Sequence, residues 1–191
     1  VDAEERKTSI LSQIAALVTP LKAEMYPDPA LLDKLANDVE APFVVMGSFP
    51  DSFLQLPLEV LSTAMREGQK LFSVVKGGKQ LPMFLGVADV VADARGFIRT
   101  GHERVLKARL ADARFFWEQD LKAGFQKSAP RLKQVLFQEK LGSYDDKAKR
   151  LEKLTAYLCG KIESCKKAAE LLQAASLCKV DLVTEMVREF P

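Results

Sequence analysis

The amino-acid sequence predicts a mainly α-helical protein with a smaller α+β part, and two observations carry this prediction. In the first half, two apolar stretches flank Gly77-Gly78, and paired glycines supply the positive φ angles that a tight hairpin turn requires. From about Gly101 onward the strand signals stop, and apolar residues recur at helical spacing. We therefore predict an α+β domain over residues 1–100 that contains a β-hairpin, followed by an all-helical domain over residues 101–191.

Capping residues and apolar periodicity define the elements before the hairpin. Asp28 can cap a helix that has Pro29 at its first position and that turns Leu31 and Leu35 inward. The continuously apolar FVVMG has the composition of a buried strand. The expected elements are a helix over residues 4–18, a helix from 29 to about 39, the strand near 43–47 and a short helix over 57–67.

The second half reads as five helices. Gly142 can end one of them, and Ser143 can cap the next, with Asp145 and Asp146 in its first turn as capping acids rather than a catalytic pair. On that helix three leucines, Leu151, Leu154 and Leu158, are predicted to face inward. The expected helices are near residues 102–123, 130–139, 144–160, 165–177 and 179–190.

Composition excludes several classes of protein. The chain has 191 residues, 48% of them hydrophobic, with 28 Lys+Arg against 26 Asp+Glu, which is ordinary for a globular protein. No apolar run approaches the roughly 20 residues that a membrane-spanning helix needs, and the first residues do not resemble a signal peptide. Three cysteines are too few for a disulfide scaffold, so we predict reduced thiols and a cytoplasmic location.

The charge is unevenly distributed along the chain. Residues 1–95 carry 9 basic and 13 acidic side chains, whereas residues 96–191 carry 19 and 13. Clustered cations favour a polyanionic partner because they displace counterions from phosphates. A solvated helix face is the alternative interpretation.

A single histidine restricts the catalytic and metal-binding hypotheses. His102 follows Gly101 near a helix start, where a cap or an exposed surface group is the expected role. A zinc site built from His102 and the three cysteines would lack the close Cys-x-x-Cys spacing of zinc knuckles. Gly77-Gly78 does not precede a helix start with Lys-Ser/Thr, as a phosphate-binding loop would. We predict no catalytic residue and no metal ligand in this chain.

The helix predicted after residue 101 has two distinct faces. Arg104, Lys107 and Arg114 cluster on one side of the helical wheel, opposite a broad apolar arc. Arg109 and Asp120 project within that arc, and Asp112 lies on its margin. A buried charge needs a partner, so Arg109, Asp112 and Asp120 are candidates for a structural ion pair. Arg109 is expected either to pair with an acid such as Asp112 or to point into a functional cleft, and an arginine that such a pair holds rigid is suited to bind phosphate.

Five segments, taken in order, resemble the β subunit family of bacterial glycyl-tRNA synthetase of the α2β2 type. They are GSFPDSFLQLPLEVL, LPMFLGV, GHERVLKARLADARFFWEQDL, LKQVLFQEKLGSYDDKAKRLEKL and LCKVDLVTEMVREFP. The chain departs from the family at His102, where Asn is usual, and at Gly68, where His is usual.

This resemblance implies a division of labour between two subunits. The α subunit is expected to hold the site that activates glycine with ATP and magnesium, while the β subunit supplies tRNA binding. The implied partners are therefore the α subunit, tRNA(Gly) and a second β subunit within the α2β2 assembly, with no cofactor bound by this chain. Family members are much longer, so the chain is expected to be a fragment that lacks the anticodon-binding part.

The helical half also resembles, faintly, an HD-type phosphohydrolase domain. The resemblance places Cys178 and Lys179 at the family's His-Asp position and Lys147 near its first histidine. Cations in place of ligands would repel a divalent metal, which implies a degenerate HD-like domain without hydrolase chemistry.

The leading functional hypothesis is acceptor-side tRNA binding together with assembly with the α subunit. The alternatives are a scaffold without RNA contact and a metal-dependent phosphohydrolase or editing domain. The candidate RNA-binding residues are Arg104, Lys107, Arg109, Arg114, Lys133, Lys147, Arg150, Lys153 and Lys179.

Overall fold

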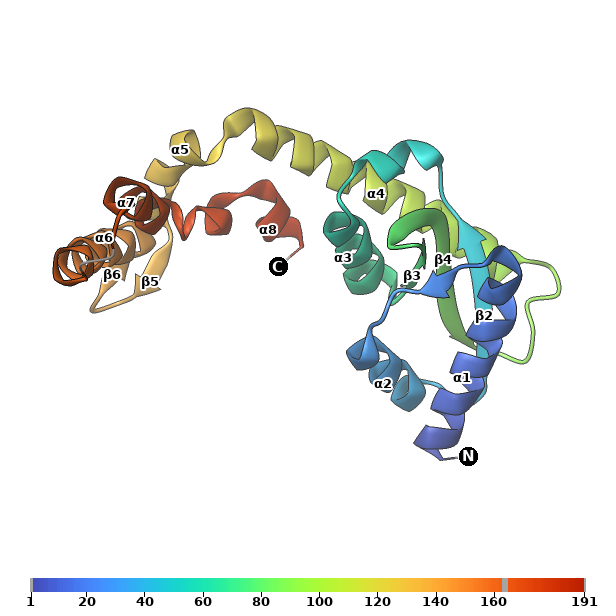
Figure 1. The fold of residues 1–191 in the computed structure, drawn as a ribbon. Helices are drawn as coiled ribbons and strands as arrows, with labels where there is room; N and C mark the ends of the chain where they lie inside the picture. The colour runs from blue at the N-terminus through green and yellow to red at the C-terminus, as the bar shows by residue number, and fades with distance from the viewer. Residues whose placement is uncertain (1, 163–164, 191) are drawn as a thin grey trace. The chain divides into compact units, whose positions relative to one another are not determined.

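The computed structural model describes residues 2–162 and 165–190. The chain is predominantly helical, with one four-stranded antiparallel sheet and one two-stranded ribbon (Figure 1). It divides into two compact units, Val1–Arg114 and Phe115–Pro191. The predicted boundary near residue 100 falls inside helix α4 (Phe97–Ala123), which starts earlier than expected because Asp93 accepts hydrogen bonds from the backbone N–H groups of Ile98 and Arg99.

The first unit is an α+β structure, in agreement with the sequence prediction. Its sheet has the strand order β1-β3-β4-β2, and every strand pair is antiparallel. The elements before α4 are α1 (Ala3–Val18), β1 (Glu24–Met25), α2 (Pro29–Asp38), β2 (Pro42–Ser48), a 3-10 helix (Asp51–Gln55), α3 (Leu58–Gln69), β3 (Phe72–Lys76) and β4 (Lys79–Asp89).

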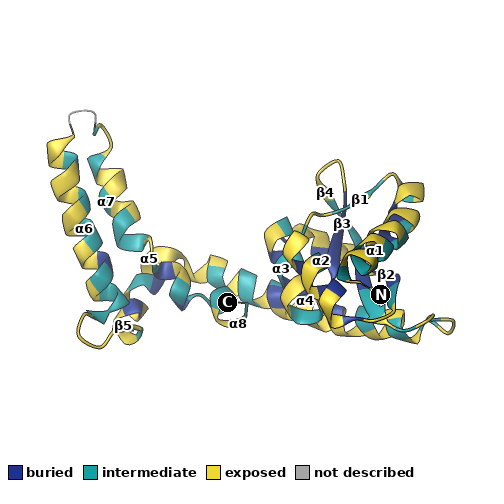
Figure 2. Ribbon diagram, turned by 90° about the horizontal axis from the view of Figure 1, so that it is seen from below, coloured by how far each residue is buried: buried dark blue, intermediate teal, exposed yellow. Residues whose placement is uncertain are grey.

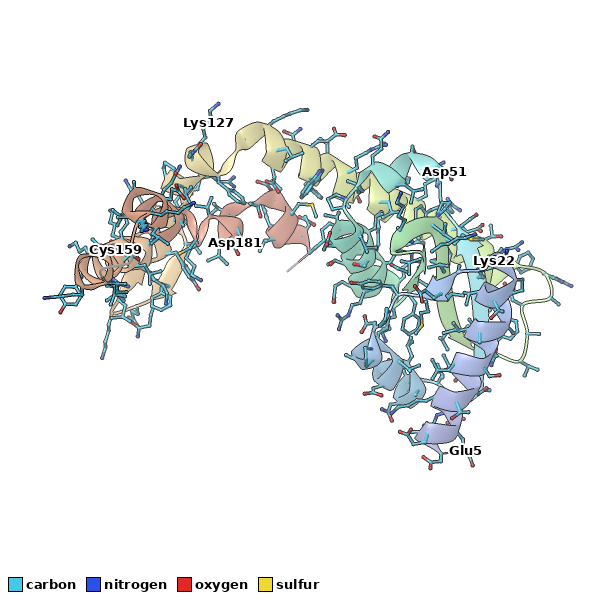
Figure 3. The ribbon with its side chains drawn as sticks, viewed as in Figure 1. Glu5, Lys22, Asp51, Lys127, Cys159 and Asp181 are labelled. Carbon is cyan, nitrogen blue, oxygen red and sulfur yellow. The ribbon has the colours of Figure 1, made fainter. Side chains whose placement is uncertain are left out.

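The predicted hairpin and caps are present. Gly77 and Gly78 join β3 to β4 with φ angles of +55° and +75°, as a two-residue hairpin turn requires. The Asp28 side chain accepts a hydrogen bond from the Leu31 N–H at the start of α2. A capping box between Asp2 and Glu5, which is labelled in Figure 3, begins α1.

Helices cover both faces of this sheet. Residues of α1 and α2 pack on one face against Val44, Phe72 and Leu85. Phe84 alternates with Leu85 along β4 and therefore points to the opposite face, where its ring meets His102 of α4 edge to face at 6.3 Å between centroids. Gly47 is required under this ring, because a Cβ there would lie 2.3 Å from the Phe84 Cζ.

The second unit contains helices and a short β-ribbon. Its elements after α4 are α5 (Phe125–Ser128), a 3-10 helix (Ala129–Gln134), β5 (Leu136–Gln138), β6 (Gly142–Ser143), α6 (Tyr144–Lys161), α7 (Ala168–Leu177), a second 3-10 helix (Val180–Val183) and α8 (Glu185–Glu189).

Several predictions for this region are wrong. Residues 130–139 do not form one helix, because the 3-10 helix ends at Gln134. The unit is not all-helical, because Leu136 and Gln138 pair with Ser143 and Gly142 across a tight turn. Gly142 has a φ of +83° in this ribbon and does not end a helix. Residues 179–190 are interrupted at Thr184, whose hydroxyl accepts a hydrogen bond from the Val187 N–H and so begins α8.

The expected inward face of α6 is also wrong. Leu154 and Leu158 are exposed, and Leu151 is half-buried, because the described residues provide only a small core beside this helix. Figure 2 shows the exposed yellow surface that runs along α6 and α7. The buried cluster of the unit consists of Leu132, Val180 and Val183.

A search of the described helices for one long and apolar enough to cross a bilayer finds none.

Candidate nucleic-acid interface

Helix α4 is fixed in the first unit by its apolar side. Leu106, Leu110 and Ala113 of the predicted apolar arc are fully buried there, whereas Val105 and Leu121, which the helical wheel places on the same arc, are exposed. Arg104 and Lys107 lie on another side of the helix and are exposed. This arrangement anchors the helix and leaves two cationic side chains open to solvent.

The cations of the first unit differ in how they are paired. Before the hairpin, several lysines and arginines form ion pairs within 4.0 Å of an acid: Lys7 with Glu4 and Asp33, Lys34 and Lys70 with Asp38, and Arg66 with Asp28 and Glu67. Within the described ranges, no ion pair involves Arg104, Lys107, Arg109 or Arg114. The positive charges of these four α4 side chains are therefore not balanced by a nearby carboxylate and are available to an anionic partner.

Arg109 lies against α3 instead of pairing with Asp112. Both side chains are exposed, and the structure has no ion pair between them, so the pairing expectation is not met. The Arg109 stem passes over Gly68, where an added Cβ would lie 2.6 Å from its Cδ. Gly68 thus provides the space that Arg109 occupies.

Arg114 and Asp120 have other contacts. The Arg114 guanidinium stacks over the Phe53 ring at 4.9 Å, which holds the cation in place without neutralising it. The Asp120 carboxylate accepts hydrogen bonds of 2.9 Å from the N–H groups of both Glu185 and Met186 and caps α8. Asp120 is therefore a structural residue, and its partners among the described residues are backbone N–H groups instead of a cation.

The remaining candidates belong to the second unit. Lys147 lies over the Phe137 ring at 3.7 Å, and the Arg150 guanidinium donates a hydrogen bond to the Leu141 carbonyl, so both are held against the β5–β6 ribbon. Lys133 and Lys153 are exposed, and Lys179 is half-buried before the second 3-10 helix. Lys127, labelled in Figure 3, is an exposed cation of α5 that we did not single out from the sequence.

The charge asymmetry is smaller when it is counted by structural unit. Counted by unit, residues 1–114 carry 14 basic and 15 acidic side chains, and residues 115–191 carry 14 and 11. The excess of cations after residue 95 is therefore shared, because the first part of α4 and its basic residues belong to the sheet unit.

Ser143 and Asp146 have the predicted capping roles, and Asp145 lies in the first turn of α6. Ser143 and Asp146 form a reciprocal capping box at the start of α6. The hydrogen bond from the Ser143 backbone N–H lowers the pKa of the Asp146 carboxyl, which keeps it ionised. Asp145 pairs with Lys149 at 2.7 Å, which raises the pKa of that lysine.

His102 lies inside α4 and faces the sheet, so the expected cap or surface role is wrong. Its Nδ1 is 3.2 Å from the Gln69 Oε1, and burial lowers the pKa of the imidazole. Gly68 and Gln69 at the end of α3 therefore contact Arg109 and His102 of α4. Residues 68 and 69 are far in the sequence from residues 102 and 109, so no pattern in the sequence alone predicts that they lie close together.

The structure does not assemble a metal site from the described residues. No group of three or more His, Cys, Asp or Glu side chains that could hold an ion occurs in residues 2–162 and 165–190. The three cysteines are free thiols. Cys159 and Cys165 nevertheless lie close to each other, since the Cys165 thiol raises the pKa of the Cys159 thiol.

Comparison with known proteins gives a consistent result. A family profile described as "Glycyl-tRNA synthetase beta subunit" matches residues 1–191. Similar curated proteins include the glycine–tRNA ligase beta subunits of Desulforudis audaxviator and Geobacter sulfurreducens, each 41% identical, and of Syntrophotalea carbinolica, 43% identical. Each alignment covers 100% of this chain and 28% of the relative.

These matches place the chain among the subunits of aminoacyl-tRNA synthetases. It belongs to the glycyl-tRNA synthetase beta subunit family. The chain spans just over a quarter of the length of the curated relatives that it matches.

Proposed function

We propose that this chain is the part of a cytoplasmic glycine–tRNA ligase β subunit that binds the tRNA(Gly) backbone and contributes to assembly with the catalytic α subunit and a second β subunit. Glycine activation with ATP and magnesium is assigned to the α subunit, and the present residues take no catalytic step. The family membership supports a role in glycine–tRNA ligation, and the exposed cations of α4 support binding of the tRNA backbone.

The unpaired state of the α4 cations is the observation that carries this proposal. An arginine or lysine already paired with an acid gains little from a phosphate, because the acid must first be displaced. Arg104 and Lys107 have no such acid among the described residues, and they protrude from a helix that Leu106, Leu110 and Ala113 anchor in the first unit. Exposed cations of this kind recognise the backbone of RNA by charge and shape rather than by base sequence.

The test removes two unpaired cations and compares them with two paired ones. In the assembled ligase of full-length subunits, Arg104→Ala with Lys107→Ala should weaken tRNA binding and lower the salt-dependence slope by about 2, one for each lost phosphate contact. The control is Lys34→Ala with Lys70→Ala, because both lysines pair with Asp38. Equal affinities and equal slopes for the two double variants would refute the RNA-binding face.

The second-unit cations rank lower in this proposal. Lys147 and Arg150 are held by Phe137 and Leu141, whereas Lys133 and Lys153 are exposed. We therefore expect removal of Lys133 and Lys153 together to affect tRNA binding more than removal of Lys147 and Arg150. A degenerate HD-like domain formed with residues beyond this chain is part of the same proposal.

A scaffold role without RNA contact is the second candidate. The exposed apolar side chains of α6 and α7, among them Leu154, Leu158 and Leu171, favour it, because contiguous exposed apolar surface marks interaction sites. Co-purification with the α subunit in the absence of RNA, set against retention on labelled tRNA, separates the two roles. The phosphohydrolase alternative is tested by metal analysis of the purified full-length subunit.

A further inference from the structure

The edge strand β2 exposes one side of its backbone. Antiparallel pairing with β4 directs the N–H and C=O groups of alternate residues, Phe43, Val45 and Gly47, toward β4. The groups of the intervening residues therefore point away from the sheet. Edge strands of this kind are open to pairing with another chain unless side chains or loops cover them.

Two side chains cover the ends of this outward row. The Gln13 side-chain amide of α1 donates to the Pro42 carbonyl at 2.8 Å and accepts from the Val44 N–H at 2.9 Å. It occupies the position that a peptide group of a neighbouring strand would take. At the other end, the Glu103 carboxylate of α4 accepts from the Ser48 N–H at 3.0 Å.

The middle of the row remains open. The Val44 carbonyl and the Met46 N–H form the next donor–acceptor pair of the same geometry as the pair that Gln13 engages. In the part of the chain that the structure describes, neither group has a hydrogen-bond partner. One peptide group of an added strand would satisfy both.

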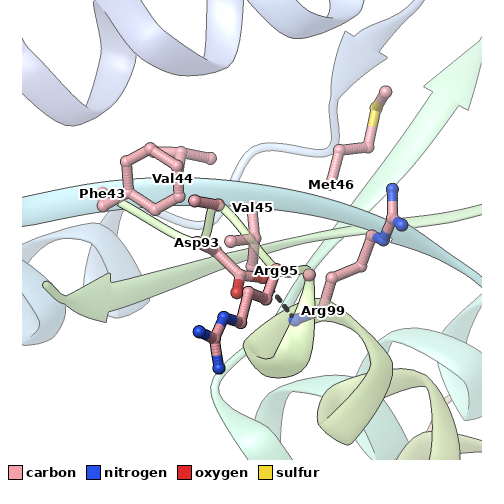
Figure 4. A pocket seen from close by; sticks show the side chains of 9 residues that line it. Phe43, Val44, Val45, Met46, Asp93, Arg95 and Arg99 are labelled. Carbon is pink, nitrogen blue, oxygen red and sulfur yellow. Dashed lines mark hydrogen bonds between the residues drawn. The ribbon is translucent and has the colours of Figure 1, made fainter. Parts of the chain in front are cut away.

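A groove of about 390 Å³ lies along this open stretch (Figure 4). Its floor is the segment Phe43–Met46, and its wall is the loop Asp93–Gly96 with Arg99 of α4. The same loop region exposes two apolar side chains, Val91 at 93% and Phe97 at 70%. Apolar side chains beside an open strand edge are suited to contact a polypeptide.

The charge of the groove is positive. Arg95 and Arg99 line it, and no ion pair of either is present within the described ranges. The one lining carboxylate, Asp93, accepts from the Ile98 and Arg99 N–H groups and faces the start of α4. Figure 4 shows the contact between Asp93 and Arg99, with the Arg95 and Arg99 guanidinium groups extending to opposite sides of it. The Arg95 guanidinium lies 5.9 Å from the Phe97 ring centroid, which leaves its charge unneutralised. Carboxylates on the incoming segment could therefore bind either guanidinium.

We propose that the open stretch of β2 receives an extended, carboxylate-bearing segment of the α subunit as an added strand. Its backbone pairs with Val44 and Met46, and its carboxylates bind Arg95 or Arg99. An extended peptide fits better than RNA, because the row offers an alternating donor and acceptor at peptide spacing with apolar side chains beside it. The inference rests on the proposed function for the identity of the partner.

The first experiment changes only one backbone donor. In the full-length subunit, Met46→Pro removes the outward N–H and leaves the hydrogen bonds of Val45 and Gly47 to β4 in place, since proline is tolerated on edge strands. Met46→Ala is the matched control, because it removes the side chain and keeps the N–H. We expect the Kd for the α subunit to be at least tenfold higher for Met46→Pro than for Met46→Ala. Equal affinities of the two variants would overturn the proposal.

The second experiment needs no substitution. Amide hydrogen exchange at Met46 should slow at least tenfold when the full-length subunit binds the α subunit, because an open N–H becomes hydrogen-bonded. Unchanged exchange in a complex that still forms would overturn the strand addition and leave the proposed function standing. Slowing by tRNA alone would make the groove an RNA contact and would also overturn it.

Charge reversal tests the carboxylate. Either Arg95→Glu or Arg99→Glu alone should raise the Kd for the α subunit at least tenfold, whereas Lys79→Glu, an equal change of charge at an exposed cation of the hairpin, should not. Equal effects of the three changes would mean that only net charge matters and would overturn the carboxylate contact. The two proposals can fail separately. If the α subunit slows exchange of the Met46 amide, and the Arg104 and Lys107 changes leave tRNA binding intact, the RNA-binding role of α4 is refuted and the β2 interface is supported.

Discussion

The two units of the chain bury apolar surface to very different extents. In the first unit, the sheet has helices on both faces, and Phe72, Phe84 and Leu85 are almost completely inaccessible to solvent. Among the described residues of the second unit, the buried apolar side chains are Leu132, Ala148, Val180 and Val183. Sheet residues with helices on both sides become buried, whereas the helix pair α6 and α7 leaves much of each surface exposed (Figure 2).

The two units are therefore stabilised mainly by different interactions. The first unit depends on apolar burial. The second depends to a larger extent on local devices, including the capping box at Ser143, the Thr184 cap of α8 and the stacking of Lys147 on Phe137. Local devices contribute about 1 kcal/mol each, less than a buried aromatic side chain.

The largest expected effect compares one phenylalanine from each unit. Phe84→Ala should lower the free energy of unfolding by about 3–5 kcal/mol, because it removes a completely buried ring. Phe115→Ala, at a ring that is 57% exposed, should change it by about 0.5 kcal/mol or less. Chemical denaturation of both variants measures the difference, and similar losses would show that the contrast in burial has no energetic counterpart.

The next effect tests whether the units unfold separately. Leu132→Ala removes the centre of the small cluster with Val180 and Val183 and should cost about 2–4 kcal/mol. A unit with so small a core should then open on its own, with fast amide exchange in α6–α8 and unchanged protection in β3 and β4. Loss of protection in the sheet as well would mean that the two units form one cooperative structure.

A smaller effect is expected at the Asp120 cap. Asp120→Ala leaves the N–H groups of Glu185 and Met186 without their acceptor, which should cost about 1–2 kcal/mol. The loss should be confined to α8 and visible as faster exchange of those two amides. Asp112→Ala on the exposed side of α4 is the control and should leave the exchange of α8 unaltered.

The smallest effect is a pH dependence of the first unit. Burial lowers the pKa of His102 in the folded state, so the unfolded state binds a proton first as the pH falls below about 6.5. The contribution of neutral His102 to stability is complete above that pH and is lost as the pH falls toward the folded pKa. Between pH 7 and 5.5 the free energy of unfolding should fall less in His102→Asn than in the unaltered chain, and parallel pH profiles would contradict this.

Sequence alone predicted the features that depend on neighbouring residues. The hairpin at Gly77-Gly78, the Asp28 cap with Pro29 and the Ser143 cap of α6 each rest on residues within a few positions of one another, and all are present. The motifs also placed the chain in its family, which the profile match confirms.

The contacts between residues that are far apart in the sequence depend on the tertiary structure. The apolar spacing of Leu154 and Leu158 correctly predicted a helix, yet the side chains are exposed, because periodicity defines a face and not what covers it. Arg109 lies over Gly68 and Asp120 caps α8, since the partner of a charged side chain is chosen by which elements pack together. The unpaired cations of α4 and the open edge of β2 are likewise invisible in sequence, because only the folded chain determines which charges and backbone groups find a partner.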